Sequence, residues 1–287
     1  MKGVILAAGE GSRMRRVTYG AFPKELLPIG NVPTIRFPLE SLRLAKIRSV
    51  LIVIAPQTKH GIIDGLQSGR KFGMELCYAV QERAEDLNSG LGAAILAARD
   101  WTDNEDFAVA CGDTIICDFS DSNPLDCLKP LIDVHKNNGS IATVLVHPTN
   151  ADPRRFGLVK FRNFREENGV MFGELDRMVE KPDARVARSL KANGYHYVLT
   201  GYYAFSPSIF SYIKKTKPGT KNEIQITDAM ELAIENGEKI IAVVHAKSKN
   251  GNLFVREYWD VGIPEEYRKA NKCLIERDVN KWLNSEE

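Results

Sequence analysis

A glycine-containing loop near the N-terminus, followed by two basic residues, could bind phosphate groups. The loop at residues 9–12 (Gly-Glu-Gly-Ser) ends a short apolar run, and Arg13 and Lys24 come after it. Glycine lets backbone N–H groups approach an anion closely, and the two cations add positive charge. The loop is not a Walker A motif, and Met14 stands where a dinucleotide-binding fingerprint has its third glycine. We interpret it as a phosphate-binding loop, with a tight turn flanked by surface charges as the alternative.

Two aspartates are candidate ligands of a metal ion. Asp113 follows an apolar run at residues 107–111, and Asp260 lies between an aromatic residue and a glycine at 262. An acid at the carboxyl end of a buried parallel strand faces the ligand crevice of an α/β sheet. Mg²⁺ is commonly held by one or two carboxylates together with substrate phosphates. Either aspartate alone would be more typical of a turn, but together with a phosphate loop they predict a Mg²⁺ site.

Polar residues in the second half of the chain could bind a phosphorylated sugar. Lys181 stands between Glu180 and Pro182; the proline fixes the chain direction, and the lysine is a point charge suited to a phosphate. Residues 197–203 and 222–228 carry hydroxyl, amide and carboxylate groups near the ends of expected elements. The alternatives are an ordinary surface lysine and side chains that cap helices.

These residues must be positioned by a sheet and its helices. In the first half, we expect strands at residues 4–8, 50–55, 74–80 and 107–111, and helices at 33–46, 62–66 and 90–98. Strands that alternate with helices are typical of a doubly wound, mostly parallel sheet covered on both faces. Such sheets bind ligands beyond the carboxyl ends of their strands, where the glycine loop and Asp113 fall.

The pattern changes after about residue 140. There we expect strands at residues 141–146, 157–161, 170–178 and 197–205, and helices at 225–235 and 264–275. The second half is interpreted as a lobe packed on the first. No Ser/Gly-rich linker or internal repeat separates the two, so we predict a single domain over residues 1–287.

Composition narrows the class of protein. The chain has 287 residues, 44% hydrophobic and 26% charged, which excludes a disordered or collagen-like chain. Its net charge of +2 gives no reason to expect a nucleic-acid or membrane partner. Five cysteines without CxxC spacing indicate neither a disulfide framework nor a zinc ribbon, and favour the cytoplasm. The N-terminal apolar run is too short for a signal peptide, and no apolar window is long enough to span a bilayer.

A series of short motifs, spread over almost the whole chain, resembles those of the sugar-1-phosphate nucleotidyltransferases. In order, they are LAAGEGSR, PKELLP, Gln81, GLGAA, CGD, VEKP, TGYY, NEIQITDA and YWDVG. The short glucose-1-phosphate uridylyl- and thymidylyltransferases are the most similar members. The resemblance implies a Rossmann-like, doubly wound α/β fold with a mixed sheet and a sugar-binding lobe. It also implies a Mg²⁺-dependent reaction of a nucleoside triphosphate with a sugar 1-phosphate, which gives a nucleotide sugar and pyrophosphate.

The same resemblance implies roles for individual residues. About 1–140 would be the nucleotide-binding half and about 141–287 the sugar-phosphate-binding half. The nucleotide would contact Ala8, Gly9, Gly11, Arg13, Lys24, Gln81 and Gly90. The sugar phosphate would contact Gly157, Glu180, Lys181, Thr200, Gly201 and Glu223. Asp113 and Asp260 would hold Mg²⁺, and the catalytic residues would be Arg13, Lys24, Asp113 and Lys181.

The motifs do not agree on the nucleotide. Segments 23–25, 90–92 and 223–225 are similar to the uridylyl branch, whereas 112–113 and 259–260 are similar to the thymidylyl branch. We expect UTP or dTTP, with UTP slightly favoured, and glucose 1-phosphate as the sugar. The alternatives are GTP or CTP with another sugar, and a non-catalytic regulatory subunit that binds a sugar nucleotide. Relatives are commonly dimers or tetramers, so we expect a homo-oligomer; segment 267–283 could form its interface or pack on its own subunit.

Overall fold

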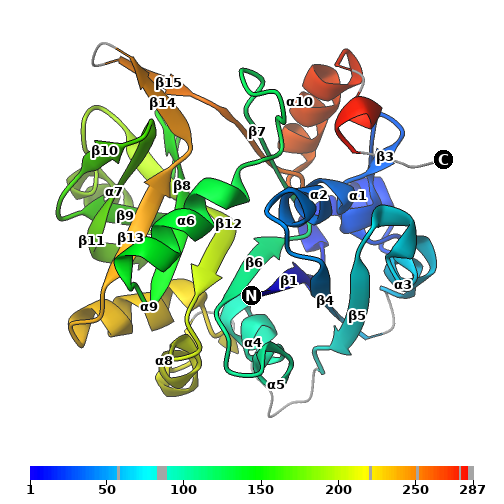
Figure 1. Cartoon of the computed structure of the whole chain (residues 1–287), viewed down its shortest axis with the longest axis horizontal. Coiled ribbons are helices and arrows are strands. Elements are labelled where there is room, and N and C mark those ends of the chain that lie inside the picture. The colour runs from blue at the N-terminus through cyan, green and yellow to red at the C-terminus, as the bar shows by residue number, and fades with distance from the viewer. Residues whose placement is uncertain (57–58, 83–88, 220–221, 250–251, 278, 284–287) are drawn as a thin grey trace.

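The structure is a computed structural model that describes residues 1–56, 59–82, 89–219, 222–249, 252–277 and 279–283. A ten-stranded mixed sheet runs through both halves of the chain (Figure 1). Its strands are β1 (Lys2–Ala7), β4 (Ser49–Ile54), β5 (Glu75–Val80), β6 (Phe107–Cys111), β8 (Ala142–Thr149), β9 (Gly157–Phe161), β10 (Arg165–Glu167), β11 (Val170–Glu180), β12 (His196–Phe205) and β13 (Ile240–Val244). They follow the order β10-β11-β13-β8-β12-β6-β1-β4-β5, with β9 paired to β11 and β12.

Helices cover both faces of this sheet, as the sequence pattern predicts. The helices are α1 (Arg15–Thr18), α2 (Arg36–Leu44), α3 (His60–Leu66), α4 (Leu91–Leu96), α5 (Arg99–Thr102), α6 (Leu128–Asn138), α7 (Ala184–Ser189), α8 (Ile209–Lys215), α9 (Ile226–Glu235) and α10 (Pro264–Ile275). Successive side chains of a strand point to opposite faces. Val4 and Leu6 of β1 therefore pack into a core with α4, α8 and α9, whereas Ile5 and Ala7 pack into a second core with α2, α3 and α6. The chain is doubly wound.

The two halves join through an antiparallel pair of strands. β5, β4, β1 and β6 are all parallel, but β12 runs antiparallel to β6, with Tyr202 opposite Ala110. β13 is parallel to β8 and antiparallel to β11. Parallel order in the first half and mixed order in the second give the mixed sheet that the resemblance implies.

Several elements differ from the sequence prediction. The expected helix at 33–46 is shorter, since α2 begins at Arg36. Strand β13 and helices α6, α7 and α8 were not predicted. In α6, Pro130 obscures the helical pattern, yet it lies in the first turn, where a missing N–H costs no helical hydrogen bond. Helices α7 and α8 are short, so they carry too few residues to show a clear period, whereas β13 is a five-residue apolar run that the pattern indicates as well as it indicates β6.

Three two-stranded ribbons complete the fold. They pair β2 (Pro28–Ile29) with β3 (Val32–Pro33), β7 (Thr114–Cys117) with β16 (Glu257–Asp260), and β14 (Ala246–Lys249) with β15 (Asn252–Val255). The C-terminal segment packs on its own chain here, because Leu274, Val279 and Leu283 are buried in a core with Trp259. Ile275 of α10 stays 63% exposed.

None of the helices in the described ranges is long and apolar enough to cross a membrane. All five cysteines, which the described ranges include, are free thiols.

Candidate active site

The topology of the parallel half defines the place of the site. In the order β5-β4-β1-β6 the direction of strand progression reverses between β1 and β6. Ligands of doubly wound sheets bind at such a switch point, beyond the carboxyl ends of the two strands. The glycine loop follows β1 at this point, and Asp113 follows β6. The two segments are hydrogen-bonded to one another, since Gly112 N donates to Leu6 O at 2.9 Å.

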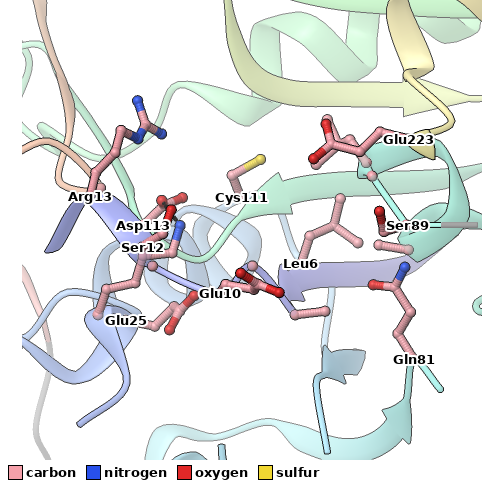
Figure 2. A pocket seen from close by; sticks show the side chains of 18 residues that line it. Leu6, Glu10, Ser12, Arg13, Glu25, Gln81, Ser89, Cys111, Asp113 and Glu223 are labelled. Atoms are coloured by element: carbon pink, nitrogen blue, oxygen red, sulfur yellow. Dashed lines mark hydrogen bonds and ion pairs between the residues drawn. The ribbon is translucent and has the colours of Figure 1, made fainter. Parts of the chain in front are cut away.

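A cavity of about 530 Å³ lies at this point. Figure 2 shows its side chains converging from β1, β6 and the segments that follow them. All seven residues expected to bind the nucleotide line it, and so do Asp113 and Glu223. The first half of the candidate site is therefore assembled in one cavity, and Glu223 of the second half belongs to it.

Lys24 runs beneath the glycine loop. A Cβ atom added at Gly9 would lie 3.2 Å from the Lys24 ammonium nitrogen, and one added at Gly11 would lie 3.5 Å from Lys24 Cδ. Gly11 also has a φ of +65°, which side-chain-bearing residues rarely adopt. The loop can therefore pass over Lys24 because both positions are glycine, and its backbone and the ammonium group meet the cavity together.

Lys24 forms a buried ion pair with Asp113; their side chains are 12% and 14% exposed. Burial alone would lower the pKa of Lys24, but the carboxylates of Asp113 and Glu25 raise it above its usual value. Burial would likewise raise the pKa of Asp113, and the paired ammonium group of Lys24 holds it below its usual value instead. Both groups are charged at neutral pH, and the cavity contains a fixed cation and a fixed anion side by side.

Asp260 is brought to Asp113 by the ribbon of β7 and β16. Asp260 lies opposite Thr114, and Val261 N donates to Asp113 O at 2.9 Å. A Cβ atom at Gly262 would lie 2.8 Å from Asp113 Oδ2 and 2.9 Å from Asp260 Oδ1, so both carboxylates face the same small space. Burial and the charge of Asp113 raise the pKa of Asp260 to about 6. Arg13 Nη2 lies 3.8 Å from Asp260 Oδ2.

This pair of carboxylates suits a hard divalent cation. The negative charge of Asp113 helps to raise the pKa of Asp260, and a divalent ion between the two carboxylates would relieve that repulsion. Within the described ranges, no group of three or more His, Cys, Asp or Glu residues is spaced to hold a metal. The donor set therefore fits Mg²⁺, which takes few protein ligands and completes its shell with water and substrate phosphates.

The far end of the cavity is formed by Gln81 and Gly90. Gln81 follows β5, and Gly90, with a φ of +100°, is the N-cap of α4. A Cβ atom at Gly90 would lie 2.6 Å from Ile224 O, and Gly92 N donates to that oxygen at 2.9 Å. A bridge between Ser89 and Glu223 continues this contact. The resemblance assigned Glu223 to the sugar, and in the structure it lies beside the residues expected to recognise the base.

The other residues expected to bind the sugar phosphate lie in a second group. Glu180 accepts a hydrogen bond from Thr227 Oγ1 at 2.8 Å, and Lys181 Nζ lies 3.1 Å from Glu180 Oε1. A Cβ atom at Gly157 would lie 3.0 Å from Glu180 Oε2. The Lys181 side chain is 55% exposed. None of these residues is among the described residues that line the cavity.

Thr200 and Gly201 lie in β12, between the two groups. Thr200 is buried, and its hydroxyl donates to Leu145 O at 2.9 Å, so it holds β12 against β8 in this conformation. Gly201 has a φ of +90°, and a Cβ atom there would lie 2.8 Å from Cys111 Sγ, which lines the cavity. Gly201 therefore lets β12 approach the cavity wall closely.

Sequence reasoning gave no individual role to half of the residues in the cavity wall. These are Leu6, Glu10, Ser12, Glu25, Ser89, Leu91, Ala94, Cys111 and Gly262. Glu10 and Ser12 belong to the predicted phosphate-binding loop, and all of them except Ser89 lie inside the motifs that carry the resemblance. The motifs as a whole therefore indicated the cavity wall better than the residues selected from them.

Comparison with known proteins places the chain in a family. Residues 2–277 match the family model described as Nucleotidyl transferase. The chain is 27% identical to the low-salt glycan biosynthesis nucleotidyltransferase Agl11 of Haloferax volcanii, over 96% of this chain and 66% of that protein. It is 31% identical to a glucose-1-phosphate thymidylyltransferase of Neisseria gonorrhoeae, over 85% of this chain and 75% of that protein.

A solved structure agrees with this result. UDP-glucose pyrophosphorylase complexed with UDP-glucose superposes with a TM-score of 0.76 and 26% identity, over 96% of this chain and 98% of that one. The chain belongs to the nucleotidyl transferase family, which confirms the resemblance seen in its motifs and the fold that the resemblance implies. It spans about two thirds of the length of Agl11.

Proposed function

We propose that this protein is a sugar-1-phosphate nucleotidyltransferase. It transfers a nucleotidyl group from a nucleoside triphosphate to a sugar 1-phosphate and releases pyrophosphate. One observation carries the proposal: the Lys24–Asp113 ion pair stands at the switch point of the sheet, in a cavity lined by a glycine loop, and the carboxylate of Asp260 faces that of Asp113 at Gly262. Relatives that are named for glucose-1-phosphate thymidylyl transfer support it.

The chemistry needs little from a general base. An oxygen of the sugar 1-phosphate is already anionic when it attacks the α-phosphorus, so the obstacle is repulsion between two polyanions and the charge that grows on departing pyrophosphate. Lys24 and Arg13 offset that charge, and the loop backbone N–H groups orient the phosphates. Asp113 and Asp260 would hold Mg²⁺, which supplies a divalent charge to the triphosphate.

The second group of residues would receive the sugar phosphate. Lys181 is largely exposed and held beside Glu180, so its ammonium group can meet an incoming phosphate without first leaving a buried position. Glu180 and Gly157 would lie next to the sugar, with Thr200 and Gly201 supporting them. We propose that residues 1–140 and 141–287 act as one domain, because Gly262 and Glu223 of the second half line the cavity of the first.

The substrates proposed are UTP or dTTP, and glucose 1-phosphate. Gln81 has an amide that can pair with the edge of a pyrimidine, and the relatives include enzymes named for both nucleotides. UTP and dTTP differ by one methyl and one hydroxyl group, and a single methyl contact discriminates by only about 1–3 kcal/mol. We further propose a cytoplasmic homo-oligomer, which the five free thiols and the exposed Ile275 on α10 support.

A substrate panel tests the proposal. Purified protein with Mg²⁺ is given UTP, dTTP, CTP, GTP or ATP with glucose 1-phosphate or another sugar 1-phosphate, and pyrophosphate release is measured. We expect a dominant pair that contains UTP or dTTP and that loses activity with EDTA. Release with GTP or CTP and another sugar would correct the substrates, and no release with any pair would favour a regulatory subunit.

A further inference from the structure

A buried ion pair lies behind the wall of the cavity. Lys59 Nζ is 2.5 Å from Glu25 Oε2, and the two side chains are 3% and 1% exposed. Glu25 lines the cavity, whereas Lys59 is not among the described residues that line it. Taking two charges out of water costs much of what their attraction returns, so a buried pair is weak evidence for stability. Its position beside Lys24 suggests a different role.

Glu25 and Lys24 come from one short turn and reach different partners. Both lie in the 3-10 turn Lys24–Leu26, where Lys24 reaches Asp113 and Glu25 reaches Lys59. Leu26 of this turn packs against Gly61 in α3, close to Lys59. Burial raises the pKa of Glu25, and the charges of Lys24 and Lys59 act against that rise. Two lysines therefore share one buried carboxylate.

The negative charge of the cavity wall makes it important that Lys59 offsets the charge of Glu25. The described lining residues include four carboxylates, Glu10, Glu25, Asp113 and Glu223, but two cations, Arg13 and Lys24. The wall thus has a formal charge of −2 although it faces a proposed triphosphate. Lys59 offsets the charge of Glu25 from behind and takes up no space in the cavity.

We propose that Lys59 is a positioning residue for phosphate binding. By neutralising Glu25, it leaves Lys24 paired with Asp113 and directed at the phosphates. Without Lys59, the carboxylate of Glu25 attracts Lys24 from the adjacent position in the chain and repels the incoming anion. The inference rests on the proposed function for the statement that the bound anion is a nucleotide. The role of Lys59 in neutralising Glu25 rests on the observed ion pairs.

Charge repair in a double variant tests the inference. Lys59→Met removes the cation, and Glu25→Gln with Lys59→Met removes both charges at nearly constant volume. Lys71→Met is the matched control, since Lys71 is exposed and donates to Gly65 O in α3, the helix that begins directly after Lys59. Binding of inorganic tripolyphosphate with Mg²⁺ is measured by calorimetry at low and high salt. Kinetic constants for UTP and dTTP follow where turnover is present.

We expect Lys59→Met to weaken tripolyphosphate binding at least tenfold at low salt, and less at high salt because ions screen the repulsion between the cavity wall and the incoming anion. The double variant should return to within about threefold of the unmodified protein, and Lys71→Met should not change. A purely structural role for Lys59 would leave the double variant as weak as Lys59→Met. That result, or unchanged binding in Lys59→Met, would overturn the inference.

Two further comparisons keep the test decisive. If Lys59→Met fails to fold, Glu25→Gln alone is compared with the double variant. Glu25→Gln retains the buried cation of Lys59, so it should bind tripolyphosphate several-fold more tightly than the double variant does. Equal affinity of the two would overturn the inference. Tripolyphosphate binding needs no turnover. A protein that releases no pyrophosphate would therefore contradict the proposed function while this test still decides the role of Lys59.

Discussion

The nucleotide side and the sugar-phosphate side of the proposed site differ in how their charges are held. Lys24 is buried, paired with Asp113 and enclosed by a glycine loop. Lys181 is more than half exposed and is paired with its own neighbour in the chain, Glu180. The charges of a buried network are already in position before the substrate binds, but their burial lowers the stability of the fold. An exposed lysine contributes little to stability and gains most of its interaction energy when the substrate binds. The two sides should therefore respond differently to substitution.

The largest effect is expected from breaking the buried side. Asp113→Asn keeps the shape of the side chain but removes the charge that pairs with Lys24 and faces Asp260. Loss of one preorganised electrostatic contact typically costs about 10²–10³ in kcat. We expect pyrophosphate release to fall about 10³-fold with the fold unchanged by circular dichroism. Asp176→Asn, at an exposed ion pair with Lys160, is the control and should keep its activity.

A smaller effect is expected at Asp260, where removal of the charge should increase the free energy of unfolding. Burial and Asp113 raise its pKa to about 6 from 3.8, so the folded state binds this proton more tightly than the unfolded chain. The contribution of Asp260 to stability is therefore present below its unfolded pKa and is lost as pH rises through 6. Without metal, Asp260→Asn should raise the free energy of unfolding by about 2 kcal/mol at pH 8, measured by urea denaturation.

That variant should also lose turnover, because the amide cannot replace a metal-binding carboxylate. Lys181→Met, on the exposed side, should change the unfolding free energy by less than about 0.5 kcal/mol. An Asp260→Asn protein less stable than the unmodified one at pH 8 would contradict the idea that the buried side stores unfavourable charge.

A third effect, on the pH dependence of stability and not on turnover, concerns His245, which supports the ribbon of the two aspartates. Its Nε2 lies 3.2 Å from Cys117 O in β7 and 3.1 Å from Glu257 O in β16. Burial, then the charge of Arg256, lowers the pKa of His245 to about 3, and burial lowers that of His147 to about 4. Each histidine therefore stabilises the fold above pH 6.5, and this stability is lost as pH falls towards its folded pKa.

Each histidine should contribute a slope of about 1.4 kcal/mol per pH unit between pH 6 and 4. His245→Gln keeps a donor for the two carbonyls and should remove one such slope from urea-unfolding measurements across this range. His60→Gln, at an exposed side chain, is the control. An unchanged slope in His245→Gln would show that the ring is not kept neutral by the fold.

The sequence predicts the buried side better than the exposed one. Parallel strands bring their carboxyl ends to one edge, so the run at 4–8 and the run before Asp113 were enough to place the loop and the acid together. No such rule applies where β12 runs antiparallel, and the predicted sugar-phosphate residues are divided between two places. The bridge that brings Glu223 beside Ser89 is a long-range contact that no local pattern encodes, so the sequence did not indicate that Glu223 lies near the residues expected to recognise the base.

The Lys59–Glu25 pair was missed for a similar reason. Lys59 is a single basic residue in a polar stretch, and nothing in its neighbourhood indicates that it is buried behind a cavity. Burial of a charge is decided by packing between α3 and the turn at Lys24–Leu26. By contrast, the two aspartates were predicted to act together because each is an acid suited to Mg²⁺, although the β7–β16 ribbon that joins them brings together distant parts of the chain.

One kinetic comparison tests the account most directly. Lys24→Met and Lys181→Met remove the same charge from the two sides, and initial rates are measured while the nucleotide and glucose 1-phosphate are varied separately. The account predicts that Lys24→Met lowers kcat about 10²–10³-fold, whereas Lys181→Met acts chiefly by raising the KM for the sugar phosphate, about 30-fold. Equal effects of the two variants on both substrates, or a sugar-phosphate KM that Lys181→Met leaves unchanged, would contradict it.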